Sequence, residues 1–209
     1  DAAGHPTRSH RDQLDLRQPA PWRRIARYAR KISLTNPMYG VIRTALDPNS
    51  EEETHFRGLY SLYNAGLISM MDGAVGDLTR TTGDYEGYNG RLGIDAYLGK
   101  PGSRADVLSI GGESFGKTGV LVNDTNPGAG YYNPTGILVA YVAGDTTPRG
   151  TFFLAEGPID KGFFTYDLYG VPGGSIDWYL ASTPNARAFE LPKMVTGAQA
   201  IWYESSGVW

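Results

Sequence analysis

Alternation of apolar and polar residues is the main pattern in the later part of the chain. Residues 92–98 place an apolar side chain at every second position, and residues 164–168, 176–180 and 198–202 repeat this alternation. A period of two predicts strands with one buried face. Residues 137–143 are apolar at both parities, which is typical of a central strand covered on both sides. Together these runs predict an all-β protein of roughly nine or ten strands.

Residues 50–63 have the period of a helix instead. Ser50 and Glu53 form the Ser-x-x-Glu pattern of a capping box, whose side chains accept hydrogen bonds from backbone N–H groups at the start of a helix. Apolar and aromatic side chains follow at helical spacing: Phe56, Leu59, Tyr60 and Tyr63. Because residues 64–66, Asn-Ala-Gly, would end such a helix, we expect an amphipathic helix over 50–63 and a strand over 67–71.

The composition fits a single β domain with many turns. The 209 residues include 28 glycines and 13 prolines, and 12% are aromatic, a mixture typical of short strands joined by tight turns. The chain has no cysteine, so it can form neither a disulfide framework nor a thiolate metal site. Its three histidines, His5, His10 and His55, lack the spacing of metal ligands. We therefore expect no metal and no cofactor.

Signals for membranes and export are missing from this sequence. No apolar run reaches the roughly 20 residues that a membrane-spanning helix needs, and residues 1–5 do not resemble a signal peptide. The chain begins with Asp1 rather than methionine, which fits a product cut from a longer precursor and fits a trimmed chain equally well. We expect no contact with a membrane.

Charge is divided unevenly between residues 1–31 and the rest of the chain. The first 31 residues hold eight basic and three acidic side chains, whereas residues 32–209 hold 11 basic and 19 acidic ones. Prolines and the lack of apolar periodicity indicate an extended arm, and arginine binds phosphate bidentately. The alternative is that residues 22–30 form an amphipathic turn that docks on the domain. We predict non-specific nucleic-acid binding by the basic residues of the arm: Arg8, Arg11, Arg17, Arg23, Arg24, Arg27, Arg30 and Lys31.

Residues 111–118 match the phosphate-binding pattern G-x-x-x-x-G-K-[ST], which ends here in Lys117 and Thr118. In nucleotide-binding domains this loop opens a helix whose positive end faces the phosphates. Here a glycine, two valines and Pro127 follow closely, and these residues disfavour a helix. We therefore interpret the match as a hairpin turn and keep a nucleotide-binding protein as an alternative.

Two hydrolytic arrangements have weaker support. Residues 112–116 match the nucleophile elbow G-x-S-x-G around Ser114, but all three histidines precede this serine, whereas the motif requires one after it. Asp95, Asp167 and Asp177 lie on the polar sides of predicted strands, and two carboxylates across a cleft can cleave a glycoside. Solvated strand faces are far commoner. We predict that the protein is not an enzyme and keep a carbohydrate-binding or carbohydrate-cleaving sandwich as a second alternative.

The order of a basic arm, short strands, an early helix and many further strands resembles the jelly-roll coat proteins of small icosahedral viruses, most closely the picorna-like group. Residues 9–17 look like the segment before the first strand of such proteins, and residues 50–68 look like their first helix and the turn after it. The resemblance implies an antiparallel jelly-roll β-sandwich, with residues 1–31 as the basic arm and residues 32–209 as the capsid domain.

The same resemblance implies a structural function. The chain would be one of several small coat proteins cut from a polyprotein, and it would assemble into an icosahedral shell around an RNA genome. The implied partners are other capsid subunits and non-specifically bound genomic RNA, and the implied location is the virion. Satellite and single-coat-protein viruses, which also carry a basic arm on a jelly roll, are close alternatives.

Overall fold

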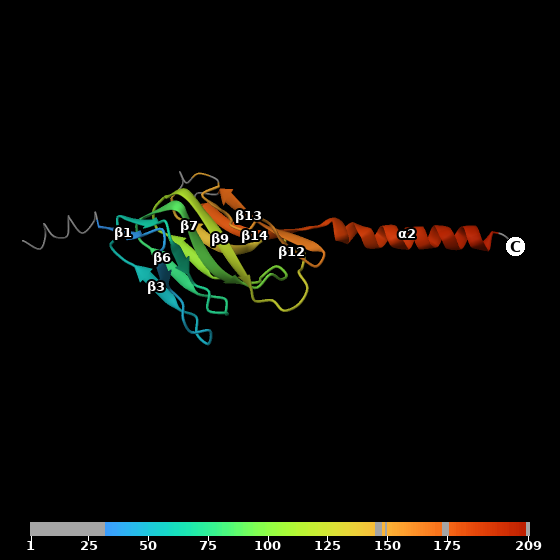
Figure 1. Cartoon of the computed structure of the whole chain (residues 1–209), viewed down its shortest axis with the longest axis horizontal. Coiled ribbons are helices and arrows are strands. Elements are labelled where there is room, and N and C mark those ends of the chain that lie inside the picture. Colours follow the sequence, from blue (N-terminus) through green and yellow to red (C-terminus); the bar gives the residue numbers. More distant parts are fainter. Residues whose placement is uncertain (1–31, 145–147, 149, 173–175, 208–209) are drawn as a thin grey trace, which may run out of the picture.

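The computed structural model describes residues 32–144, 148, 150–172 and 176–207 of the chain. These residues form a β body from which one long helix projects (Figure 1). The predicted basic arm, residues 1–31, lies outside the described residues. Within the described ranges, no helix is both long and apolar enough to cross a membrane.

Fourteen strands and one helix make up the described part of the chain. In chain order they are β1 (Ser33–Asn36), β2 (Val41–Arg43), β3 (Glu53–Phe56), β4 (Ser61–Asn64), β5 (Leu67–Ser69), β6 (Leu78–Thr81), β7 (Asp84–Ala96), β8 (Val107–Ile110), β9 (Ser114–Asp124), β10 (Ile137–Val142), β11 (Phe152–Leu154), β12 (Ile159–Lys161), β13 (Phe164–Pro172), β14 (Ile176–Pro184) and α2 (Ala186–Ser206). Most strands are short, so the chain turns frequently.

Successive parts of the chain stack in parallel as the turns of a coil. One side consists of β1, β4 and the first parts of β7 and β9; a second consists of β2, β5 and the later parts of β7 and β9. The third side is formed by β3, β6, β8 and β10. Every one of these pairs is parallel. The result is a parallel β-solenoid of about 4 turns.

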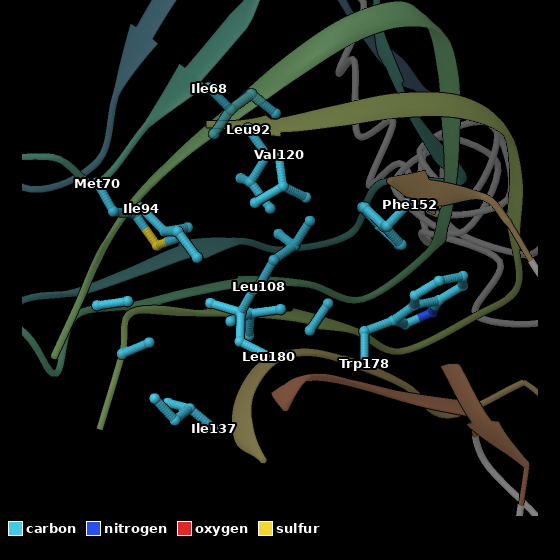
Figure 2. Close-up of a cluster of buried hydrophobic side chains, with 14 of the residues drawn as sticks. Ile68, Met70, Leu92, Ile94, Leu108, Val120, Ile137, Phe152, Trp178 and Leu180 are labelled. Carbon is cyan, nitrogen blue, oxygen red and sulfur yellow. The ribbon is translucent and has the colours of Figure 1, made fainter. Parts of the chain in front are cut away.

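Apolar side chains fill the interior and recur at the same place in successive turns. Ile68 pairs in register with Leu92, and Leu92 pairs with Val120, so one aliphatic side chain from each turn joins a continuous stack. Figure 2 shows this stack together with Leu108 and Leu180 from the other sheet. Full burial of each such side chain contributes roughly 1.5–3 kcal/mol relative to exposure. The core therefore depends on the register between turns.

The last strands change direction. β14 pairs antiparallel with β10, β13 pairs antiparallel with β14, and β12 pairs antiparallel with β13. The register of the β13–β14 pair runs without a break from Phe164↔Pro184 to Pro172↔Ile176. One of the two sheets therefore ends in an antiparallel hairpin and the three-residue strand β12, not in a further parallel turn.

The chain is all-β as predicted, but the predicted jelly-roll sandwich is wrong because the main pairs are parallel. The predicted strands at 137–143, 164–168 and 176–180 correspond to β10, β13 and β14. Alternation shows which face of a strand is buried, but it does not show the direction of the neighbouring strand. The sandwich was inferred from the alternation and from the order of the elements, and neither fixes that direction.

The predicted helix over 50–63 is also wrong, since β3 and β4 occupy this segment. Leu62 and Asn64 are buried against the next turn. The predicted helix stop is a turn of the coil, in which Gly66 packs so closely that a Cβ would lie 2.2 Å from the carbonyl oxygen of Gly40. The predicted strand at 198–202 lies within α2, where Trp202 is exposed.

Candidate functional site: the two ends of the solenoid

One end of the solenoid has unpaired strand edges. In the part of the chain that the structure describes, β1, β2 and β3 each pair only with the next turn. Ile32 and Val41 are 57% and 58% exposed beside these edges. Backbone N–H and C=O groups on such an edge can pair with another strand, and exposed apolar side chains can continue the core. This end, which we call the open edge, is suited to accept a preceding parallel turn.

The other end carries the final antiparallel hairpin, which an aromatic stack joins to the core. The Tyr85 and Phe152 rings stack with centroids 5.7 Å apart, and the Trp178 ring meets Phe152 edge-on at 5.5 Å. All three side chains are buried. Because these residues come from β7, β11 and β14, the stack connects the parallel turns to the final hairpin. We call β12, β13, β14 and this stack the closed end.

Polar contacts hold a long loop against the closed end. The Tyr166 hydroxyl accepts a hydrogen bond from the Tyr131 N–H (3.0 Å) and donates to the Tyr131 carbonyl (2.9 Å). The Lys161 ammonium group on β12 binds the Asp124 carboxylate and the carbonyl oxygen of Asn126. These contacts fix the loop between β9 and β10, so the closed end is tied to the last parallel turn by side chains as well as by strand pairing.

Buried polar side chains link successive turns on the side formed by β1, β4, β7 and β9. The Asn36 Nδ2 group donates to the Asn64 Oδ1 atom (2.8 Å), and the Asn64 Nδ2 group donates to the Tyr85 hydroxyl (3.0 Å) and to the Arg91 carbonyl (3.1 Å). The Tyr85 hydroxyl is 2.9 Å from the Thr118 Oγ1 atom. Each turn thus contributes one polar side chain to a continuous chain of hydrogen bonds, which we call the asparagine ladder: Asn36, Asn64, Tyr85 and Thr118. This ladder fixes the register of the four turns.

Replacing Asn64 by alanine should lower the free energy of unfolding by about 2–4 kcal/mol. Asn64 is fully buried, and the change removes its hydrogen bonds to the Asn36 side chain, the Tyr85 hydroxyl and the Arg91 carbonyl, each worth about 0.5–1.5 kcal/mol. Equilibrium urea denaturation measures the loss. Asn49→Ala, at an exposed position where the side chain contacts only the exposed Asp47, is the matched control. Equal effects of the two substitutions would contradict the role of the ladder.

Aspartates form a second ladder on another corner of the coil. The Asp106 carboxylate accepts hydrogen bonds from the backbone N–H groups of Gly76 (3.0 Å), Asp77 (3.1 Å) and Asp95 (2.7 Å). The Asp95 carboxylate in turn accepts from the N–H groups of residues 72 and 73, at 2.8 and 2.7 Å. Burial raises the pKa of Asp106 to about 7 and also raises the pKa of Asp77. The ladder therefore couples folding to pH.

The aspartate ladder does not form a metal centre. Across the described residues, no group of three or more histidine, aspartate or glutamate side chains is arranged to hold a metal ion. The carboxylate oxygens instead accept backbone N–H groups of neighbouring turns. We interpret the ladder as a structural device.

The predicted nucleic-acid-binding residues (Arg8, Arg11, Arg17, Arg23, Arg24, Arg27, Arg30 and Lys31) lie outside the described residues. The two ends consist of side chains that the sequence did not single out. Trp178 and the paired asparagines were visible in the sequence only as members of short strands.

The phosphate-binding match at 111–118 is a corner of the coil. The backbone N–H groups of Gly111 and Gly112 donate to carbonyl oxygens of residues 81 and 83 in the preceding turn, at 2.8 and 3.2 Å. Residues 114–118 begin β9, so no helix follows. The N–H groups that would cradle a phosphate are thus used in stacking. The predicted hairpin is wrong too, because β8 and β9 belong to different sheets.

The hydrolase arrangements also find no support in the geometry. Ser114, the candidate nucleophile, is fully buried. Asp95 belongs to the aspartate ladder, Asp167 accepts the N–H of Leu168, and Asp177 accepts the Tyr179 hydroxyl. These carboxylates are engaged in local structural contacts on separate strands.

The fold and its two unlike ends define a class: a short parallel β-solenoid with one open and one closed end. Comparison with known proteins then gives a family match, since residues 65–168, about half of the chain, match the model described as Autochaperone Domain Type 1. The matched range runs from the turn before β5 into β13. In its solenoid fold and in this match, the chain is similar to the autochaperone domains of bacterial autotransporters.

Individual relatives agree with this assignment. The chain is 35% identical over 122 residues to "Probable autotransporter YfaL" of Escherichia coli (strain K12), an alignment covering 56% of this chain and 9% of that protein. It is 30% identical over 162 residues to "Adhesin BmaC autotransporter" of Brucella suis biovar 1 (strain 1330), covering 72% and 4% respectively. "Uncharacterized protein YuaQ" of E. coli is 33% identical over 134 residues, or 63% and 10%. The chain thus spans a tenth or less of the length of these relatives.

These findings overturn the predicted coat protein. The family match and the relatives are bacterial, so the resemblance to picorna-like capsid proteins is wrong. The implied capsid partners, the genomic RNA, the polyprotein origin and the virion location are wrong with it. The two alternatives, a nucleotide-binding protein and a carbohydrate-binding or carbohydrate-cleaving sandwich, are unsupported as well. The resemblance failed because it depended on a helix at 50–63 that the protein does not form.

Proposed function

We propose that this chain is the closing segment of an autotransporter passenger and acts as an intramolecular chaperone for it. The closed end folds first, and the open edge then serves as a template on which preceding turns of the passenger stack. The contrast between the two ends carries this proposal. The antiparallel hairpin covers β10 at the closed end, whereas β1, β2 and β3 leave their outer edges free, so preceding parallel turns can be added there.

The partner in this proposal is the preceding part of the same polypeptide, and the setting is the bacterial outer membrane or the cell surface. The printed names of two relatives, which are autotransporters, support this setting. The small share of each relative that the chain covers supports a segment within a much longer polypeptide.

The order of folding follows from the sequence separation of the contacts. β13 and β14 are adjacent in the chain and pair over their whole length, so their contact closes a short loop. β1, β2 and β3 are three or four residues long and pair only with strands of the next turn. Short parallel strands cannot form alone, because parallel pairing first requires a long loop to close. The open edge should therefore form last, on turns that are already folded.

Pulse-labelled hydrogen exchange during refolding tests this order. We expect amides of β9, β10, β13 and β14 to become protected first, and amides of β1, β2 and β3 to become protected last. Protection of the open edge before the closed end would contradict the proposal. Simultaneous protection of all strands would contradict it too, since a template must exist before the strand that it receives.

Two variants sharpen this experiment. Ile42→Pro removes a backbone N–H in the middle of β2, and proline is poorly tolerated within strands. It should abolish protection of β2 and leave the closed end unchanged. Trp178→Phe, at the closed end, should instead slow protection of all strands. The reverse pattern would place the folding nucleus at the open edge.

A further inference from the structure

A groove of about 420 Å³ crosses the outer face of the sheet that contains β3, β6, β8 and β10. Its central row consists of one residue from each of four adjacent strands. His55 pairs in register with Arg80, Arg80 with Ser109, and Ser109 with Tyr141. Because adjacent strands lie about 4.8 Å apart, this row runs along the solenoid axis for roughly 14 Å, the length of a short extended segment.

The charge of the groove is positive. Arg57 and Arg80 line it, and no carboxylate is among its described lining residues. Glu53 lies outside the lining and binds the Arg80 Nε atom (2.6 Å) and the His55 Nε2 atom (2.8 Å). Glu53 thus pairs with Arg80, whereas Arg57 contacts His55.

His55 holds the guanidinium group of Arg57 in place. Its Nδ1 atom accepts from the Arg57 Nε and Nη2 groups at 3.4 and 3.3 Å, while its Nε2 atom donates to Glu53. The Arg57 Nη1 group has no hydrogen-bond partner among the described residues. A guanidinium group held in this way can bind a carboxylate through its planar fork of N–H donors.

Apolar surface lies between the polar groups of the groove. The Tyr141 ring, which is 38% exposed, and the half-buried Phe56 contribute to the lining beside the two arginines. A simple ion would not use this surface. A ligand that does must carry an apolar group close to its negative charges.

From this combination we infer that the groove binds an acidic peptide segment in which carboxylate side chains flank an apolar one. The carboxylates bind Arg57 and Arg80, and the apolar side chain lies against Tyr141. The linear row of lining residues matches an extended peptide in length. This inference concerns the outer face of the solenoid and does not depend on the templating function of its ends.

Binding of matched synthetic peptides to the full chain tests the inference. A blocked hexapeptide with a Glu-Leu-Glu core should bind with a Kd of about 0.1–1 mM, as followed by isothermal titration or by amide chemical shifts. The Gln-Leu-Gln peptide should bind at least about tenfold more weakly, because bonds to charged groups are lost. A Glu-Gly-Glu peptide should bind several-fold more weakly than Glu-Leu-Glu. Equal affinity for all three would overturn the inference.

Substitutions separate the groove from the basic residues 1–31, which could also attract an acidic peptide. Arg57→Gln should weaken binding of the Glu-Leu-Glu peptide at least about tenfold. Arg104→Gln is the matched control, because Arg104 pairs with Glu51 and lies outside the groove. Binding that survives Arg57→Gln unchanged would show that the groove is not the site. Inorganic phosphate should not displace the peptide at comparable concentrations. If it binds the groove as tightly as the peptide does, the inference is overturned, because the site would then recognise only an oxyanion. Arg57 is exposed, and an unchanged urea midpoint verifies that its variant folds.

Discussion

Replacing Trp178 by alanine should lower the free energy of unfolding by about 3–5 kcal/mol, the range for large-to-small substitutions of buried aromatic residues. The Trp178 side chain is 2% exposed and meets Phe152 edge-on at 5.5 Å. Its loss opens a cavity at the junction of the closed end and the parallel turns. Because this loss is a large part of the 5–15 kcal/mol that stabilises a typical domain, Trp178→Ala should denature at a much lower urea concentration than the parent chain.

Two other substitutions define what this experiment measures. Trp202→Ala removes the same side chain from α2, where it is 64% exposed, and should change the stability by no more than about 0.5 kcal/mol. Trp178→Phe keeps most of the ring and removes an indole Nε1–H that has no hydrogen-bond partner within the described residues. It should therefore cost much less than Trp178→Ala. Similar losses for Trp178→Ala and Trp202→Ala would show that the aromatic stack does not connect the closed end to the core.

The chain should be more stable in mild acid than at pH 8, in contrast to domains whose carboxylates are mostly paired. Burial raises the pKa of Asp106 to about 7, whereas an aspartate in an unfolded chain has a pKa of about 3.9. At a pH between these two pKa values, the Asp106 carboxyl is protonated in the folded state and ionised in the unfolded state. The contribution of Asp106 is therefore complete below about pH 4 and is lost as the pH rises through 7. Its size is at most about 4 kcal/mol.

Urea denaturation between pH 5.5 and pH 8 measures this effect. The lower limit avoids the exposed Asp47, Glu51 and Glu53, whose pKa values are lowered by hydrogen bonds and which act in the opposite direction only in stronger acid. Asp106→Asn should be less stable at pH 5.5, because the amide cannot accept all three N–H groups, but its stability should vary less with pH. Trp178→Phe, which removes no titratable group, should keep the slope of the parent chain. If the stability of Asp106→Asn still falls between pH 5.5 and pH 8 as steeply as that of the parent chain, the pH dependence arises from another residue.

Local patterns in the sequence predicted strands better than they predicted how these strands pair. The alternation in residues 164–168 and 176–180 located β13 and β14 because it follows from the two faces of a single strand. The parallel stacking of Ile68, Leu92 and Val120 has no such local signal. The spacing between these residues differs from turn to turn, and β7 and β9 pass through corners at which other turns break into two strands. No regular repeat was therefore visible.

The two ends of the solenoid were harder still to predict, since they depend on contacts between distant residues. Asn36 and Asn64 are 28 positions apart, so nothing in the sequence marks them as partners. The helical spacing of Phe56, Leu59, Tyr60 and Tyr63 was real, but pairing with the next turn overrides it. Tertiary context of this kind commonly outweighs local propensity.

The three-residue strand β12 has a consequence for assembly in concentrated solution. It is the outermost strand of its sheet, and its Lys161 is bound to the loop between β9 and β10. A short strand that carries a lysine is a poor template for a neighbouring molecule. Two copies should therefore associate through their open edges, which offer three strands, more readily than through β12. Because such a contact uses the open edge of both molecules, it should give pairs and not long fibres.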